Sequence, residues 1–245
     1  MRERIFYVLT FFLLLSVQCC AETSCADAAL LARSTVTITR HFDETERLSQ
    51  RPGVIGIRGA GWFRSPTTIV TVEHVANAMG LSTEDWKLLK IGDNQTVSVR
   101  VYRWLDGRVE RLAVLKLQTA IATAQSIAIR TGRLAPEDRV VTLVSLDRNP
   151  RSVIGRFVQY VDDGNLAGSA LLEVFEGENR LVIDHGASGA PVFDCEGRIV
   201  AVISTVMTQA LGSPFGVIRI STAWGSPNVV SVPVQPLAIE LSELP

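Results

Sequence analysis

The sequence lacks an excess of charge of either sign. Lysine and arginine number 24 and aspartate and glutamate 25, so the formal net charge is −1 at pH 7. The basic residues are scattered along the chain instead of forming a patch or stripe, and the electrostatic footprint of a protein that wraps nucleic acid is absent. We therefore expect no nucleic-acid partner.

Histidine and cysteine are scarce, with three and four residues. His41, His74 and His185 have no partner at a close metal-ligand spacing such as H-x-x-x-H, and Cys25 lies far from Cys195 in the sequence. We therefore expect neither a metal centre nor a cofactor.

The sequence also lacks a hydrophobic run long enough to cross a bilayer. The N-terminal run at residues 5–15 has about eleven residues, whereas a spanning helix needs roughly 20. Arg2 and Arg4 precede this run and small residues ending at Ala21 follow it, which is typical of a cleaved secretory signal peptide. We expect signal residues 1–21 to be removed, no stable membrane insertion, and a secreted or periplasmic protein. An uncleaved anchor is the alternative.

Cleavage would leave two cysteines in the mature chain, because Cys19 and Cys20 lie within the signal. An oxidising compartment then permits a disulfide between Cys25 and Cys195. Two separate thiols are the alternative, because a sequence does not give the Cα separation that a bond requires.

Helical patterns are few, and short β-like segments dominate. From residue 33 onward, runs rich in Val, Ile, Thr and Leu are interrupted at close intervals by Gly, Pro, Asp and Asn, which favours an all-β sandwich or barrel. The expected strands cover residues 35–39, 54–58, 61–64, 68–72, 96–102, 111–117, 139–145, 152–161, 171–175, 189–193 and 198–205, with a final pair within 217–232. Short helices are expected at 75–79 and 237–244.

This number of strands suits an all-β protein made of two six-stranded antiparallel β-barrels with a short C-terminal helix. Residues 119–136 are rich in Ala, Thr, Ser and Gly and read as a linker. We expect an N-terminal barrel over residues 22–120 and a C-terminal barrel over residues 121–245.

The segment around Ser188 has the residues of an acyl-transfer site. It reads G-A-S-G-A-P-V from residue 186 to 192 and continues through a D-x-x-G turn into another apolar stretch. A glycine two residues before the serine lets the amides of Gly186 and Ser188 converge on one point, where they would stabilise an oxyanion. Alone, such a turn is more often a plain hairpin.

An upstream segment supplies a candidate general base. Residues 69–75 read I-V-T-V-E-H-V, which places His74 at the end of a strand and the beginning of a short helix. A histidine there is by itself more often structural than catalytic, but together with the serine turn it becomes a candidate general base.

Both segments, with the G-A-G-W stretch at residues 59–62, resemble the catalytic segments of trypsin-like serine peptidases. Residues 134–141 and 152–158 resemble the second barrel of bacterial Deg-type periplasmic members. The resemblance covers roughly residues 30–240 and implies a chymotrypsin-like fold, a polypeptide substrate, His74 as base and Ser188 as nucleophile. We expect a monomer, without the C-terminal peptide-binding module of Deg-type assemblies.

The sequence departs from the family at the triad acid. The family pattern is D-L-A-V-L-K-L, and here Arg111 stands in place of the aspartate. One candidate is Glu110, which a bulge or loop would let reach inward despite the one-residue step. Asp106 is a second candidate, although it reads as a turn former. Without an acid, the protein would be a weak Ser-His dyad or a pseudopeptidase that binds a peptide or protein. We expect a serine endopeptidase with Glu110 as the acid.

Specificity residues follow from the same resemblance. The floor of the primary pocket is expected six residues before Ser188, at Val182, with Ser204 and Thr205 on the wall. An apolar floor disfavours Lys or Arg and favours small or medium apolar side chains at the scissile position. His185 either lines the cleft or is an exposed loop residue.

Overall fold

A computed structural model of the chain describes residues 25–50, 52–92, 95–144, 150–176, 180–181, 186–206, 208–213, 216–221 and 227–245. The expected signal peptide at residues 1–21 lies outside this range. Within it, no helix is both long enough and apolar enough to span a bilayer.

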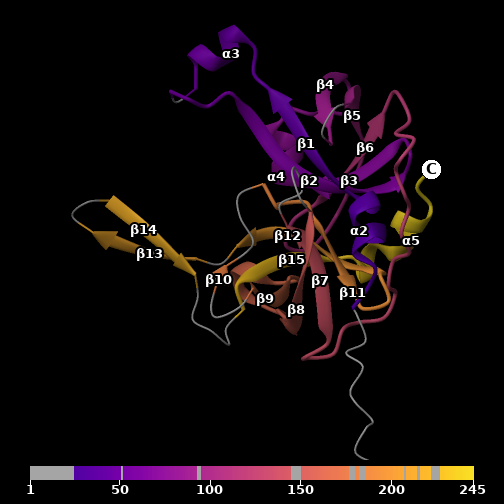
Figure 1. Ribbon diagram of the computed structural model, residues 1–245, viewed down its shortest axis with the longest axis vertical. Coiled ribbons are helices and arrows are strands. Elements are labelled where there is room, and N and C mark those ends of the chain that lie inside the picture. The colour runs from indigo at the N-terminus through magenta and orange to yellow at the C-terminus, as the bar shows by residue number, and fades with distance from the viewer. Residues whose placement is uncertain are drawn as a thin grey trace, which may run out of the picture.

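The first half of the chain folds into a closed barrel of six antiparallel strands, the upper body in Figure 1. In chain order these are β1 (Thr35–His41), β2 (Gly56–Ser65), β3 (Thr68–Val72), β4 (Lys87–Ile91), β5 (Gln95–Leu105) and β6 (Leu112–Leu117). The order around the barrel is β1-β2-β3-β6-β5-β4, and β4 pairs back with β1. Buried side chains that include Ile38, Trp62, Ile69 and Leu115 fill the interior.

The second half forms another closed barrel. Its strands are β7 (Arg139–Val144), β8 (Arg151–Tyr160), β9 (Ala170–Glu176), β11 (Pro191–Asp194), β12 (Ile199–Val206) and β15 (Val229–Pro233). They are ordered β9-β15-β12-β11-β7-β8, and pairing of β8 with β9 closes the ring. The short β10 (Arg180–Leu181) adds to β9. The expected fold of two six-stranded barrels with a C-terminal helix is thus confirmed.

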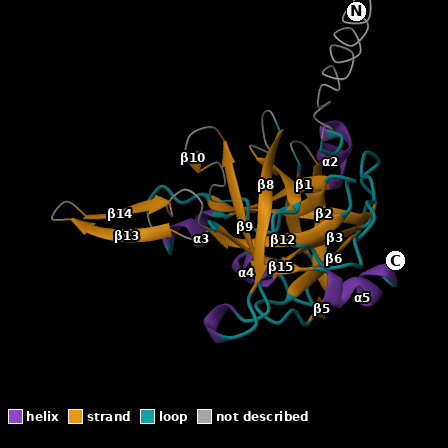
Figure 2. Cartoon of the chain, turned by 90° about the horizontal axis from the view of Figure 1, so that it is seen from below, coloured by secondary structure: helices purple, strands orange, loops and turns teal. Residues whose placement is uncertain are grey.

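One hairpin stands apart from both barrels. Strands β13 (Thr208–Ser213) and β14 (Gly216–Ser221) pair with each other in a separate two-stranded sheet. Figures 1 and 2 show this hairpin projecting away from the second barrel, between β12 and β15 in the chain.

The remaining elements are short. They are α2 (Ala28–Ser34), α3 (Glu44–Leu48), α4 (Glu73–Ala78), the 3-10 turns η1 (Gly164–Leu166) and η2 (Gln235–Leu237), and α5 (Ala238–Ser242). The last helix docks on the first barrel, where Arg64 Nε donates to the Leu241 carbonyl at 2.7 Å. Since α5 follows the second barrel in the chain, this contact fastens the two barrels together.

One division between strands was predicted wrongly. The separate strands expected at 54–58 and 61–64 are the single strand β2. The glycines that suggested a break are required by close packing, because a Cβ on Gly61 would lie 2.6 Å from Ile69 Cγ2. The final two strands expected within 217–232 are present as β14 and β15, although β14 pairs with β13, which was not expected, while β15 pairs with β12 and β9.

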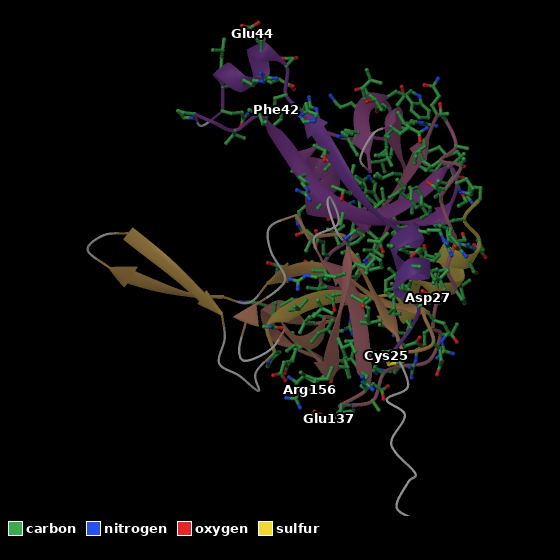
Figure 3. The ribbon with its side chains drawn as sticks, viewed as in Figure 1. Cys25, Asp27, Phe42, Glu44, Glu137 and Arg156 are labelled. Atoms are coloured by element: carbon green, nitrogen blue, oxygen red, sulfur yellow. A yellow bond between two sulfur atoms is a disulfide. The ribbon has the colours of Figure 1, made fainter. Side chains whose placement is uncertain are left out.

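Cys25 and Cys195 form a disulfide with a Cα–Cα distance of 4.2 Å. Figure 3 labels Cys25 beside the second barrel, to which the bond ties the segment that leads into β1. The two cysteines are 170 residues apart in the sequence, so the bond closes a long loop and restricts the unfolded chain strongly.

Replacing both cysteines with alanine is therefore expected to lower the free energy of unfolding by roughly 2–5 kcal/mol. Urea denaturation of the oxidised and reduced protein measures this change. Reductant should lower the midpoint of the wild-type protein and leave that of the double variant unchanged. An equal midpoint for the oxidised and reduced wild-type protein would show that the bond has no stabilising role.

Candidate active site

The end of β3 and the beginning of β6 lie side by side. Val72 pairs with Leu112 at this edge of the first barrel. Glu73 and His74, the first residues of α4, follow β3 directly, and residues 106–111 form the loop that leads into β6. Pairing of these two strands therefore brings His74 near the residues that precede Leu112.

Glu110 binds His74 at two points. Its Oε1 lies 2.7 Å from the ring Nδ1 and also accepts a hydrogen bond of 2.8 Å from the His74 backbone amide. The N-cap residue Val72 has no side-chain acceptor, so Glu110 satisfies an amide that the first turn of α4 leaves open. With Nδ1–H donated to the carboxylate, Nε2 of His74 is the nitrogen that accepts a proton.

A third donor comes from the second barrel. Ser204 Oγ donates to Glu110 Oε2 at 2.6 Å, so both carboxylate oxygens are bonded. The Glu110 side chain is 13% exposed and that of His74 is 50% exposed, which leaves the imidazole open to a substrate. The carboxylate is held in the interface between the two barrels.

These contacts lower the pKa of Glu110 below its ordinary value of 4.5. Burial of the carboxyl raises its pKa, but the hydrogen bonds from His74 and Ser204 together outweigh burial. Glu110 is therefore ionised at neutral pH, as an acceptor of the Nδ1 proton must be.

The loop conformation explains how Glu110 reaches His74 from one residue before the family position. Strand alternation would place residues 110 and 111 on opposite faces, but β6 begins only at Leu112. Glu110 thus lies outside the regular ladder, and its side chain is one methylene longer than that of aspartate.

Arg111 and Asp106, the other residues of this loop considered for the position of the acid, form no hydrogen bond or ion pair with the His74 side chain in the described structure. Arg111 forms an ion pair with Glu73, and its guanidinium carbon lies 4.9 Å from the centre of the Trp104 ring. Asp106 acts on Arg111 electrostatically and raises the pKa of that guanidinium, after the larger effect of Glu73.

The Ser188 turn is fastened to both barrels. The Ser188 carbonyl accepts a hydrogen bond of 2.8 Å from Ala60 in β2, and the Gly189 amide donates to the Ile203 carbonyl of β12 at 2.8 Å. The Ser188 hydroxyl donates to the Ser204 carbonyl at 3.0 Å. Ser188 therefore lies at the same interface as Glu110 and Ser204.

Gly186 lies at the start of this turn with a φ of 97°, a conformation that favours glycine. Within the described part of the chain, the amides of Gly186 and Ser188 donate to no protein acceptor. They are thus available to a substrate oxygen. Val182 and His185, which were expected at the pocket floor and cleft, lie outside the described residues.

Ser204 has a contact that the sequence did not indicate. It was expected on the wall of the primary pocket, but its hydroxyl binds Glu110 and its carbonyl accepts from Ser188. The register of β12 against β15 shifts between Ile203 and Thr205, so Ser204 is the extra residue of a β-bulge. Bulges redirect a side chain in this way, and no sequence signal marked this one. Thr205 is exposed and pairs with Val230.

Gly189 is expected to tolerate no side chain. Its φ is 90°, and a Cβ would lie 2.0 Å from the Ala60 carbonyl oxygen and 2.3 Å from Thr71 Oγ1. Gly189→Ala should therefore lower the free energy of unfolding by at least about 3 kcal/mol, measured by urea denaturation.

Gly132→Ala is the matched control, because a Cβ at Gly132 meets no atom within 4 Å. Its effect should stay within about 0.5 kcal/mol. Equal stability of the two variants would show that the turn around Ser188 is not held as described.

In the described ranges there is no cluster of three or more His, Cys, Asp or Glu side chains that could hold an ion.

Comparison with known proteins gives one family and a set of related folds. The family model of the trypsin-like peptidase domain matches residues 59–202. No curated protein sequence gives a significant match. Among solved structures, the active form of the Rv3671c protease from M. tuberculosis superposes with a TM-score of 0.58 at 14% identity, covering 91% of this chain and 86% of that one. Deg5 gives a TM-score of 0.55 at 14% identity, with coverages of 86% and 88%.

Proposed function

Because the chain belongs to the trypsin-like peptidase domain family, we propose that it is an exported serine endopeptidase whose catalytic triad is Ser188, His74 and Glu110. The observation that carries the proposal is the 2.7 Å contact between Glu110 Oε1 and His74 Nδ1. It supplies a carboxylate to the imidazole although Arg111 occupies the family position of the acid.

The reaction follows from this geometry. Ser188 Oγ attacks the carbonyl carbon of the scissile peptide and its proton passes to His74 Nε2, while Glu110 stabilises the imidazolium. The amides of Gly186 and Ser188 stabilise the oxyanion. The C–N bond then breaks, the Nε2 proton passes to the leaving amine, and an ester between Ser188 and the acyl group remains. Water, activated by the same imidazole, hydrolyses this ester.

The Ser188 hydroxyl has to turn before attack. It donates to the Ser204 carbonyl, so in the proposed mechanism it must leave this acceptor and donate to His74 Nε2 instead. Catalytic hydrogen bonds often form only when substrate is bound, so this orientation fits a resting enzyme.

Export and specificity are part of the same proposal. The Cys25–Cys195 disulfide supports export, because such bonds persist in oxidising compartments. Two assignments rest on the sequence alone, namely residues 1–21 as a signal peptide and Val182 as the floor of the primary pocket. Substrates with small or medium apolar side chains before the scissile bond are proposed on that basis.

A pseudopeptidase that binds peptide in the cleft is the second candidate, favoured by the hydrogen bond from Ser188 to the Ser204 carbonyl. Labelling with a fluorophosphonate probe separates the two. The peptidase should react at Ser188 and lose reactivity when denatured. A folded protein that does not react would favour the pseudopeptidase.

A further inference from the structure

Arg111 is joined to the residue next to the general base by both its side chain and its main chain. Its guanidinium pairs with the Glu73 carboxylate, and its carbonyl accepts a hydrogen bond of 3.0 Å from the Glu73 amide. Glu73 directly precedes His74. The residue in place of the family acid therefore holds the beginning of the helix that carries His74.

The face of Trp104 completes this contact. The Arg111 guanidinium carbon lies 4.9 Å from the Trp104 ring centre, within the range of a cation–π interaction. Trp104 pairs with Ala113 in the ladder between β5 and β6, so its position is set by the barrel. Arg111 thus links the loop at residues 106–111 to a fixed strand on one side and to α4 on the other.

Residues 110 and 111 together supply acceptors for the first two backbone amides of α4. The Glu110 carboxylate accepts from the His74 amide, and the Arg111 carbonyl accepts from the Glu73 amide. Both contacts require that residue 111 lies against Glu73 while residue 110 faces inward. A one-residue slip of the loop would break them and bring the cation toward His74.

We infer that Arg111 is a positioning residue, which holds the loop in the register that presents Glu110 to His74. This inference rests on the proposed triad and extends it to a residue whose side chain contacts Glu73 and Trp104. The arginine at the family's acid position thus helps to hold the proposed acid, which lies one residue earlier in the chain.

The contacts of Arg111 predict separate effects on stability and catalysis. Its side chain is 43% exposed, and exposed ion pairs contribute little to stability. Displacement of a catalytic group by about 1 Å can lower the rate by about 10²-fold. Loss of the Arg111 side chain should therefore reduce turnover much more than it reduces stability.

Arg103→Met is a matched control for Arg111→Met. Arg103 lies in the same barrel, is 47% exposed and pairs with Glu240 at 2.8 Å, on the helix α5. Hydrolysis of a peptide ester should show kcat lowered by roughly 10- to 100-fold in Arg111→Met, with KM little changed. Arg103→Met should match the wild-type protein, and Arg111→Lys should recover part of the loss because it keeps the charge.

Coupling between Arg111 and Glu73 gives a second readout. Glu73→Gln should lower kcat as Arg111→Met does, and the double variant should show little further loss. Additive losses, or equal kcat values for Arg111→Met and Arg103→Met, would overturn the positioning role while leaving the peptidase proposal intact.

A measurement that needs no turnover tests the positioning role of Arg111 separately from the proposed peptidase activity. In ¹⁵N-histidine-labelled Ser188→Ala protein, the low-field proton resonance of the bond from His74 Nδ1 to Glu110 should be present. It should broaden or vanish when Arg111→Met is added and persist with Arg103→Met. If the wild-type protein has no hydrolytic activity, this resonance still decides the role of Arg111, and its persistence in Arg111→Met would overturn that role.

Discussion

Ser188→Ala is expected to lower kcat for an unstructured protein such as casein by about 10⁶-fold, to the limit of detection. The variant removes the oxygen that forms the acyl-enzyme in the proposed mechanism. Stability should change little, because within the described residues the side chain makes one hydrogen bond, to the Ser204 carbonyl.

The control for this variant is Ser242→Ala, at an exposed position of α5, where the hydroxyl donates to the Ile239 carbonyl of the same helix. It should retain full activity. Undiminished casein hydrolysis by purified Ser188→Ala would show that the activity comes from another site or from a contaminating enzyme.

Glu110→Gln should have the second largest effect, a fall in kcat of about 10⁴-fold, as for amide replacement of a triad acid. The amide cannot stabilise an imidazolium, and its NH₂ group would favour the wrong tautomer of His74. The test is kcat for a peptide ester at neutral pH, with KM measured alongside.

Asp106→Asn is the matched control, since Asp106 is the other carboxylate of the same loop and its effect is electrostatic, on Arg111. We expect a change of less than about threefold, since Asp106 has no contact with the triad. A large loss in Asp106→Asn with full activity in Glu110→Gln would assign the acid to Asp106 instead.

The lowered pKa of Glu110 also predicts how stability depends on pH. A carboxyl whose folded pKa lies below its unfolded value stabilises the fold above the unfolded pKa, and this contribution is lost as the pH falls through the folded pKa. The difference in unfolding free energy between the wild-type protein and Glu110→Gln should therefore be largest near neutral pH and shrink below about pH 4.5. A difference that stays constant down to pH 3 would contradict the hydrogen bonds described for the carboxylate.

The barrels could be predicted because their strands are rich in β-branched residues and are separated by turn residues. The family resemblance, carried by the segments around His74 and Ser188, is confirmed by the match over residues 59–202. Strand β4 and helices α2 and α3 were missed. Their short segments are positioned by the barrel and by caps such as Asp27 and Asp43, and they have little periodicity of their own.

The acid could not be assigned from the sequence because its position depends on tertiary structure. If β6 began at residue 110, alternation along the strand would turn the Glu110 side chain away from His74. Because β6 begins at Leu112, Glu110 is free of this alternation and can reach His74. Strand pairing decides where β6 begins. The role of Ser204 was missed for a related reason. Its direction results from a bulge in β12, which depends on pairing with β15.

Pre-steady-state hydrolysis of a p-nitrophenyl ester tests the central hypothesis most directly, because it follows formation of the Ser188 ester itself. We expect a burst of about one nitrophenolate per chain, with the trapped acyl group mapped to Ser188 by mass spectrometry. The burst should persist in Asp106→Asn and become slow in Glu110→Gln. Absence of a burst from folded wild-type protein, or an acyl group on another residue, would contradict a triad of Ser188, His74 and Glu110.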